Sequence, residues 1–261
     1  MQDFAISVIF EDDSLLIINK PAGVTVNRAE TTKHTITVQD WAEKKIGIKN
    51  QESGNTEEIK FGEEGWDPRV DFYKRGGIVH RLDKETSGVL IIAKTPDAFV
   101  NLQEQFRERK VKKTYIALAH GIISPKEGEI SVPVGRLPWN RSRFGILPGG
   151  RESKTLYTVL SYYQHPAIKD QLTLVELYPQ SGRTHQIRVH LKYLNHPIFA
   201  DFLYAGRKTA RSDRELLPRV FLHAAKISFT HPVIQREVSY EASLPKKIAD
   251  FLKSLEKITI K

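Results

Sequence analysis

The stretch "HRLDKETSG", His80 to Gly88, places an aspartate among basic and hydroxyl side chains immediately before the apolar run Val89 to Ala93. A side chain at such a boundary stands at the end of a buried strand, where binding and catalytic residues are common. A carboxylate held there can add to an electron-poor carbon, stabilise its charge or remove a proton. Asp83 is therefore the first catalytic candidate, although an aspartate in a turn more often has a structural role.

Other catalytic chemistries lack the residues that they need. The chain has no cysteine, which excludes thiolate nucleophiles and Cys-ligated zinc. His185 and His190 are five residues apart rather than four, and no glutamate follows His185 as in the zinc motif HExxH. There is no GxSxG elbow, no GxxxxGKS or GxxxxGKT loop, no GxGxxG after a strand and no assignable carboxylate pair. We therefore expect no metal ion, no nucleotide and no other cofactor.

A second candidate segment is "SGRTHQIRVHLKYLNHP", which follows an apolar strand pattern. Ile187, Leu191 and Leu194 recur at helical spacing and predict a helix over about 184–194. Arg183 stands just before this helix, at a boundary where its side chain can point into a cleft.

The charge of the chain favours a polyanionic partner. The net charge is +9, with a pI near 9.5. No run of about 18 apolar residues is present and the first residues do not resemble a signal peptide, so we expect no membrane association and a cytoplasmic location. Arginines interleaved with Trp139 and Phe144 in "VGRLPWNRSRFGILPGGRESK" are typical of an RNA-binding surface.

The apolar patterns predict an α+β fold. Strand signals recur from the first residues to "VFLHAAKISF", with helices expected over 37–45, from Pro96 onward, over 184–194 and over 246–255. Residues 47–77 are rich in Gly, Glu, Lys and Asn and are interpreted as a surface insertion. We expect the aromatic residues of this insertion to anchor it to the body.

Taken together, several segments resemble a known family. "GGIVHRLDKETSGVLIIAKT" is similar to the signature of the RluA class of RNA pseudouridine synthases. "EDDSLLIINKPAGV", "KKTYIALAHG", "SGRTHQIRVHLKYLNHPIFADFLYAG" and "FLHAAKISFTHP" resemble the other motifs of that class, in the same order. The resemblance implies a mixed, mainly antiparallel sheet whose two halves flank an active-site cleft. It also implies isomerisation of uridine to pseudouridine in a structured RNA, namely a stem-loop of ribosomal or transfer RNA.

The resemblance also implies roles for single residues. Asp83 matches the catalytic aspartate, Tyr115 the active-site tyrosine, and Arg183 the arginine that pairs with the aspartate. Arg81 matches an arginine that can enter the RNA stack. The remaining candidates match positions near the substrate pocket, with a structural role favoured for the last two: His80, Lys20, Lys113, His185 and Ile187.

These roles fit a reaction without a cofactor. The N1–C1′ bond breaks, the base turns and C5 joins C1′, so nothing is oxidised. An arginine beside Asp83 would stabilise and aim its anion. Tyr115 would stack on or hydrogen-bond the uracil and could help to take the C5 proton.

The chain also departs from the family pattern. Many members carry a small RNA-binding domain before the catalytic one, whereas here the opening strand begins near residue 1. We therefore expect one catalytic domain over 1–261, without an accessory domain, acting as a monomer. Gly76 stands where the pattern has proline and Ala200 where it has glycine.

Two other functions stay open at this stage. A catalytically silent RNA-binding protein would keep the basic charge without using Asp83. A sugar-active hydrolase would release free uracil, although it would need a carboxylate pair.

Overall fold

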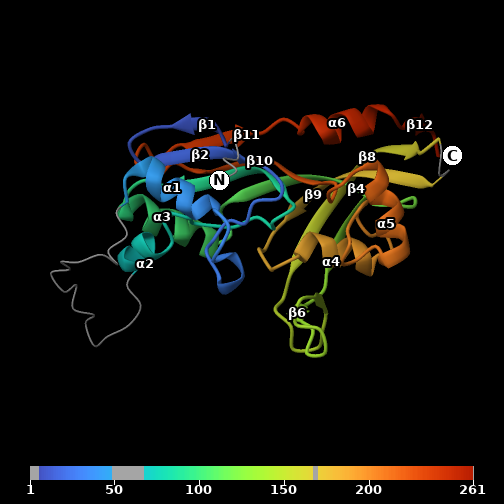
Figure 1. Cartoon of the computed structure of the whole chain (residues 1–261), viewed down its shortest axis with the longest axis horizontal. Helices are drawn as coiled ribbons and strands as arrows, with labels where there is room; N and C mark the ends of the chain where they lie inside the picture. Colours follow the sequence, from blue (N-terminus) through green and yellow to red (C-terminus); the bar gives the residue numbers. More distant parts are fainter. Residues whose placement is uncertain (1–5, 49–67, 167–169, 261) are drawn as a thin grey trace.

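The computed structural model describes residues 6–48, 68–166 and 170–260. Ten of its strands form one sheet in the order β1-β2-β3-β10-β4-β9-β8-β12, with β11 paired to β10 and β5 to β8 (Figure 1). These strands are β1 (Ser7–Glu11), β2 (Leu15–Lys20), β3 (Ser87–Ala93), β4 (Lys112–His120), β5 (Glu127–Ser131), β8 (Lys154–Gln164), β9 (Gln171–Pro179), β10 (Leu222–Thr230), β11 (Glu237–Glu241) and β12 (Glu256–Ile258). A separate hairpin consists of β6 (Val134–Arg136) and β7 (Phe144–Ile146).

Short helices complete the described part of the chain. They are η1 (Glu30–Thr32), α1 (Val38–Ile46), α2 (Pro68–Lys74), α3 (Pro96–Arg107), α4 (Gln186–Tyr193), α5 (Arg207–Leu216) and α6 (Lys246–Lys253). Within the described residues, none of these helices has the length and apolar character needed to cross a bilayer.

The predicted α+β class with a mainly antiparallel sheet is confirmed. Every strand pairing in the large sheet is antiparallel except that between β3 and β10. All seven residues of β3 are buried, because α3 covers one face and α1 the other. Covering both faces explains why this strand is continuously apolar rather than alternating.

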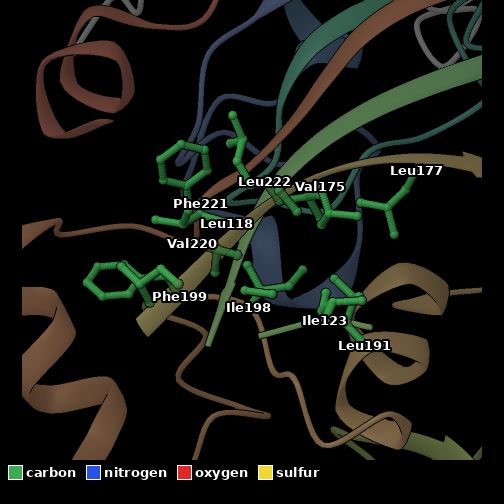
Figure 2. Close-up of a cluster of buried hydrophobic side chains, with 14 of the residues drawn as sticks. Leu118, Ile123, Val175, Leu177, Leu191, Ile198, Phe199, Val220, Phe221 and Leu222 are labelled. Atoms are coloured by element: carbon green, nitrogen blue, oxygen red, sulfur yellow. The ribbon is translucent and has the colours of Figure 1, made fainter. Parts of the chain in front are cut away.

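Besides the apolar side chains around β3, a second apolar core lies on the other side of β10 in the strand order, around β4, β9 and α4. Figure 2 shows its centre, where the segment Ile198–Phe199 packs against these elements. The Phe199 amide donates to the Leu118 carbonyl at 2.8 Å, so the segment is fastened to β4. This attachment fixes Asp201, two residues further on.

The predicted helix after Ala93 is confirmed as α3. Thr95 caps it by accepting a hydrogen bond from the Ala98 amide, and Pro96 occupies its first turn. Phe99 and Leu102 are fully buried, as their spacing predicts.

The segment 47–77, interpreted from the sequence as a surface insertion, contains a helix that the sequence did not predict. Residues 49–67, with Phe61 and Trp66, lie outside the described residues. Pro68–Lys74 form helix α2, in which Phe72 is buried against Phe99 with ring centroids 5.9 Å apart. Phe72 therefore anchors this helix, as expected of the aromatic residues.

The two departures from the family pattern occur at unusual backbone conformations. Gly76 has φ +56°, which proline cannot adopt. Ala200 has φ +61°, a left-handed conformation that favours glycine, and its amide donates to the Asp213 carboxylate at 2.9 Å. The hydrogen bond helps to offset the strain of an alanine at that position.

Gly88 lies where β3 meets β10, and its substitution tests this junction. Its φ is +119°, and a Cβ there would lie 2.1 Å from the Ala224 carbonyl oxygen. Gly47 is also left-handed, with φ +71°, but has nothing within 4 Å of its Cβ position. We expect Gly47→Ala to lower the free energy of unfolding by about 1 kcal/mol and Gly88→Ala by at least about 3 kcal/mol. Urea denaturation measures both, and equal losses would contradict the close approach of the two strands.

Candidate active site

A pocket of about 550 Å³ opens where the loop before β3 faces β4 and the start of α4. Among the predicted site residues, all but Lys20 line it: His80, Arg81, Asp83, Lys113, Tyr115, Arg183, His185 and Ile187. Residues that are more than 100 positions apart in the sequence therefore meet in one cavity.

Asp83 presents its carboxylate to this pocket from the loop that leads into β3. Its side chain is 23% exposed, and its Oδ2 lies 3.1 Å from Arg188 Nη1. The Nε2 of His185 lies 3.7 Å from the same oxygen. Among the described residues, Oδ1 has no hydrogen-bond partner, so this oxygen is available to a substrate.

Arg188 connects Asp83 to a second, fully buried carboxylate. Its Nε and Nη2 donate to the two oxygens of Asp201 at 2.7 and 2.8 Å. The guanidinium carbon lies 5.0 Å from the centroid of the Tyr204 ring. Burial disfavours the charge, but hydrogen bonding and attraction to Asp201 and Asp83 outweigh it and raise the pKa of Arg188. The guanidinium is therefore a permanent cation in a fixed orientation.

The prediction that Arg183 pairs with Asp83 is wrong, because Arg188 does so. Arg183 lies at the rim of the pocket, where its Nε donates to the Glu152 carbonyl at 3.3 Å. The segment "GRTHQIR" contains both arginines, and the motif alone does not say which one turns inward. One signal could have decided it: Arg188 lies three residues before Leu191, on the apolar face of the helix, where a charge needs a partner.

His185 lies next to Asp83 in the neutral form. Burial lowers its pKa, although the charge of Asp83 opposes the shift. Its Nδ1 lies 2.8 Å from the Tyr204 hydroxyl, which accepts a hydrogen bond from the Phe144 amide at 3.1 Å. The Tyr204 hydroxyl thus joins the His185 ring to the backbone of Phe144, and the Nε2 side of the ring faces Asp83.

Tyr115 and Lys113 lie two residues apart on β4 and so project from the same face. Burial and the nearby Asp83 raise the pKa of Tyr115, so its phenol is protonated at neutral pH. Burial, with Arg109 adding to the effect, lowers the pKa of Lys113 to about 8. The ammonium group of Lys113 donates to the Ser181 carbonyl at 3.2 Å.

Lys20 lies outside the pocket and supports the loop that carries Asp83, which corrects its predicted place near the substrate. The side chain is fully buried, and its Nζ donates to the carbonyls of Pro21, Val24 and Lys84. Lys84 directly follows Asp83. Lys20 therefore ties the end of β2 to this loop instead of contacting a substrate.

His80 and Ile187 also have structural surroundings. His80 Nε2 accepts the Ile91 amide at 2.9 Å, and its ring stacks on Phe106. Burial lowers the pKa of His80 to about 3, so it is neutral and fastens the loop to β3. Ile187 is 6% exposed and belongs to the apolar core while it lines the pocket.

A further anchor of the loop escaped the sequence analysis. Arg219 donates through Nη2 to the Glu85 carbonyl, the Ser87 hydroxyl and the Leu222 carbonyl, at 3.0–3.1 Å. Arg214 pairs with the Glu85 carboxylate at 2.7 Å. Together with Lys20, these arginines hold both sides of the turn that carries Asp83.

The rim of the pocket is basic. Arg81 is exposed on the loop itself, and the opening is also lined by the last residue of α3, Arg107, by Arg109 just after it, and by Arg183 just before α4. Over the described ranges, no three His, Cys, Asp or Glu side chains are grouped so that they could hold a metal ion. The chemistry that the site offers is thus a fixed carboxylate in a cation-rimmed cavity.

Comparison with known proteins places this geometry in a family context. A family model described as RNA pseudouridylate synthase matches residues 14–193. The chain is 36% identical, over 97% of its length, to the ribosomal large subunit pseudouridine synthase D of Neisseria meningitidis serogroup B, of which it spans only 62%. It is 35% identical, over 92% of its length, to the uncharacterized RNA pseudouridine synthase YhcT of Bacillus subtilis, and covers 69% of that protein.

The fold comparison agrees with the sequence comparison. The structure of human RNA pseudouridylate synthase domain containing 1 matches with a TM-score of 0.69 and 25% identity, over 100% of this chain and 93% of that one. Asp201 and Tyr204, which orient Arg188 and His185, lie beyond residue 193, where the family match ends.

The two arginines of the motif should differ sharply in their contribution to stability. Arg188→Met leaves the buried Asp201 carboxylate without its partner, and we expect a loss of about 3–5 kcal/mol in the free energy of unfolding. Arg183→Met removes a partly exposed side chain and should cost less than about 0.5 kcal/mol. Urea denaturation measures both. Adding Asp201→Asn to Arg188→Met should recover part of the loss, and equal effects of the two single variants would rule out the buried ion pair.

The buried Lys20 predicts a pH-dependent stability. Burial lowers its pKa to about 7, with Arg219 adding to the effect and Asp83 opposing it, whereas an unfolded lysine titrates near ~10.4. Between these values the unfolded chain binds more protons, so the free energy of unfolding rises with pH, by at most about 1.4 kcal/mol per pH unit. Lys20→Met lacks this contribution.

The measurement is urea denaturation of both proteins from pH 6 to pH 9.5. The advantage of the wild type over Lys20→Met should grow above about pH 7 and level off below it. A difference that does not change with pH would contradict the lowered pKa. Lys113 is common to both proteins and cancels.

Proposed function

The chain belongs to the RluA class of the RNA pseudouridylate synthase family, and on that premise we propose that it isomerises uridine to pseudouridine in a structured RNA. The observation that carries the proposal is the Asp83 carboxylate, which is fixed by Arg188 and faces Tyr115 across one pocket. The reaction rearranges the atoms of one nucleotide and consumes no second reagent.

Asp83 is the group that acts on the ribose. As the N1–C1′ bond breaks, C1′ becomes electron-poor and the carboxylate can add to it, stabilise its charge or remove the C2′ proton. All three routes use an oxygen that the protein leaves free, which is Oδ1. Arg188 holds Oδ2 with a hydrogen bond of 3.1 Å, which leaves Oδ1 for the sugar.

Tyr115 positions the base. Its raised pKa keeps the phenol protonated, which suits a ring that stacks on the uracil or donates a hydrogen bond to it. A protonated phenol is a poor acceptor for the C5 proton, so we assign Tyr115 to orientation and not to proton removal.

The basic rim receives the RNA. A uridine inside a stem must leave the stack to enter the pocket, and Arg81 is exposed beside Asp83, where it can fill the space left behind. Arg107, Arg109 and Arg183 would contact the neighbouring phosphates. We infer that the RNA is a stem-loop of ribosomal or transfer RNA, bound by one copy of the protein in the cytoplasm.

Tritium release tests the proposal. Unmodified ribosomal and transfer RNA transcripts labelled at C5 of uridine should release tritium with the wild-type protein. Asp83→Asn should lower release by at least about 10³-fold and change RNA affinity by less than about threefold, because the amide keeps the size of the carboxylate. Arg183→Gln should mainly raise the RNA concentration that gives half-maximal rate.

Other outcomes would identify another function. RNA binding by the wild type without tritium release would indicate a silent binding protein. Free uracil among the products would indicate a glycosidic hydrolase. Equal release by Asp83→Asn would remove Asp83 from the mechanism.

A further inference from the structure

The β6–β7 hairpin (residues 134–146) extends away from the main sheet below α4 (Figure 1). Its base is attached to the active site. The Phe144 amide donates to the Tyr204 hydroxyl at 3.1 Å, and the Phe144 ring meets the His185 ring edge-on at 5.5 Å. Val134 and Ile146 pack with Val189 of α4. The hairpin is therefore fixed to the helix that carries Arg188.

The tip of the hairpin exposes a tryptophan. Trp139 is 76% exposed, the highest value among the large apolar side chains of the described residues. The turn beneath it is ordered by backbone hydrogen bonds from Asn140 to Leu137 and from Arg143 to Asn140, at 3.2 and 2.9 Å. An aromatic side chain on an ordered turn loses little entropy when it binds a partner.

All the charged side chains of the hairpin and of the segment that follows it are positive. Residues 134–151 contain four arginines and no acidic residue. None of the four forms an ion pair with a carboxylate in the part of the chain that the structure describes: Arg136, Arg141, Arg143 and Arg151. Arg136 instead lies over the Phe144 ring, 5.2 Å from its centroid. Exposed arginines without acidic neighbours complement a phosphate backbone.

From these observations we propose that the β6–β7 hairpin is a second RNA contact, in which Trp139 stacks on an unpaired base outside the active-site pocket. Arg141 and Arg143 bind the phosphates on either side of that base. The inference rests on the proposed function only in taking RNA as the partner. It adds a contact that selects RNAs with an unpaired base at a fixed distance from the target uridine.

RNA fits this surface better than a protein does. A nucleobase offers a flat face to the indole, and such stacking tolerates any base. The flanking phosphates match Arg141 and Arg143, which follow Trp139 within four residues of the sequence. A protein partner would need a dense acidic surface to neutralise the same arginines.

Because the base of the hairpin is attached to the active site, the contact should affect the binding of RNA and the rate of reaction differently. Trp139 lies on the same rigid unit as His185 and Arg188, so a docked tip places the RNA relative to Asp83. The tip itself is remote from the reacting atoms. Changes at the tip should therefore weaken RNA binding and leave the rate at saturating RNA unchanged.

The first test compares Trp139→Ala with Trp139→Phe, which keeps a ring that can stack. The control is Ile234→Ala, which truncates another exposed apolar residue between two strands, 57% exposed. With unmodified transcripts of large-subunit ribosomal RNA and of transfer RNA, Trp139→Ala should weaken binding and raise KM at least about tenfold, with kcat unchanged. Trp139→Phe should stay within about threefold of the wild type, and the control should match it.

The second test measures stacking directly. The chain has three tryptophans, and Trp41→Phe with Trp66→Phe leaves Trp139 as the only tryptophan, whose emission is separated from that of the tyrosines by excitation at the red edge of the indole band. Stacking on a base should quench its emission as the same transcripts are added. Arg141→Ala with Arg143→Ala should reduce the salt dependence of log Kd by about 1.4, at about 0.7 for each phosphate. Lys246→Ala with Lys247→Ala, which removes the same charge from α6, should not.

The outcomes separate this inference from the proposed function. One outcome is that RNA quenches Trp139 and that Trp139→Ala binds RNA more weakly, while the wild type releases no tritium. That outcome would support the RNA contact and contradict the enzymatic proposal. Tritium release with unquenched Trp139, or with unchanged KM in Trp139→Ala, would overturn the contact while the enzyme stands. A wild-type protein that binds neither transcript would overturn the contact as well.

Discussion

The guanidinium of Arg188 is the interaction on which the arrangement of the site depends. It lies between two carboxylates from distant parts of the chain, Asp83 and Asp201. Removing three charges from water is unfavourable unless they satisfy one another. Asp201 binds the Nε and Nη2 side of the guanidinium and Asp83 binds Nη1, so the first contact orients the group for the second. The loop before β3 and the helix α4 are thereby held in one relative position.

The sheet brings this ion pair and Tyr115 together. Asp83 lies four residues before β3, Tyr115 lies on β4, and β10 runs between these two strands. The contact between β3 and β10 is short, with two paired positions, and it is close because Gly88 has no side chain. The buried Lys20 and Arg219 then fasten the loop with hydrogen bonds to its carbonyls. A change that weakens the β3–β10 junction should therefore also displace the Asp83 carboxylate.

The sequence predicted what local patterns determine. Apolar periodicity and Pro96 in the first turn identified α3, and the position of Asp83 before a buried strand identified the catalytic candidate. Arg183 was chosen wrongly, because the choice between two arginines in one motif depends on which face of α4 packs inward. Asp201 and Tyr204 were missed for a related reason: they reach Arg188 and His185 through a turn that has no periodic signal. The helical end of the 47–77 segment was also missed, since Phe72 is fixed by a tertiary contact with Phe99.

The distribution of charge suits the proposed opening of an RNA at this site. Inside the pocket, Asp83 and Arg188 are paired with each other, so they orient groups but contribute little new binding energy. Extruding a nucleotide costs a few kcal/mol, and that energy has to come from contacts that form only with the RNA. Within the described residues, Arg81, Arg109 and Arg183 of the rim and the four arginines of residues 134–151 form no ion pair with a carboxylate. Arg107 is paired with Glu104 at 2.7 Å. The unpaired arginines would supply such contacts. In the proposed reaction, the buried Arg188 aims the carboxylate, whereas the exposed arginines of the rim and of the hairpin would hold the polyanion.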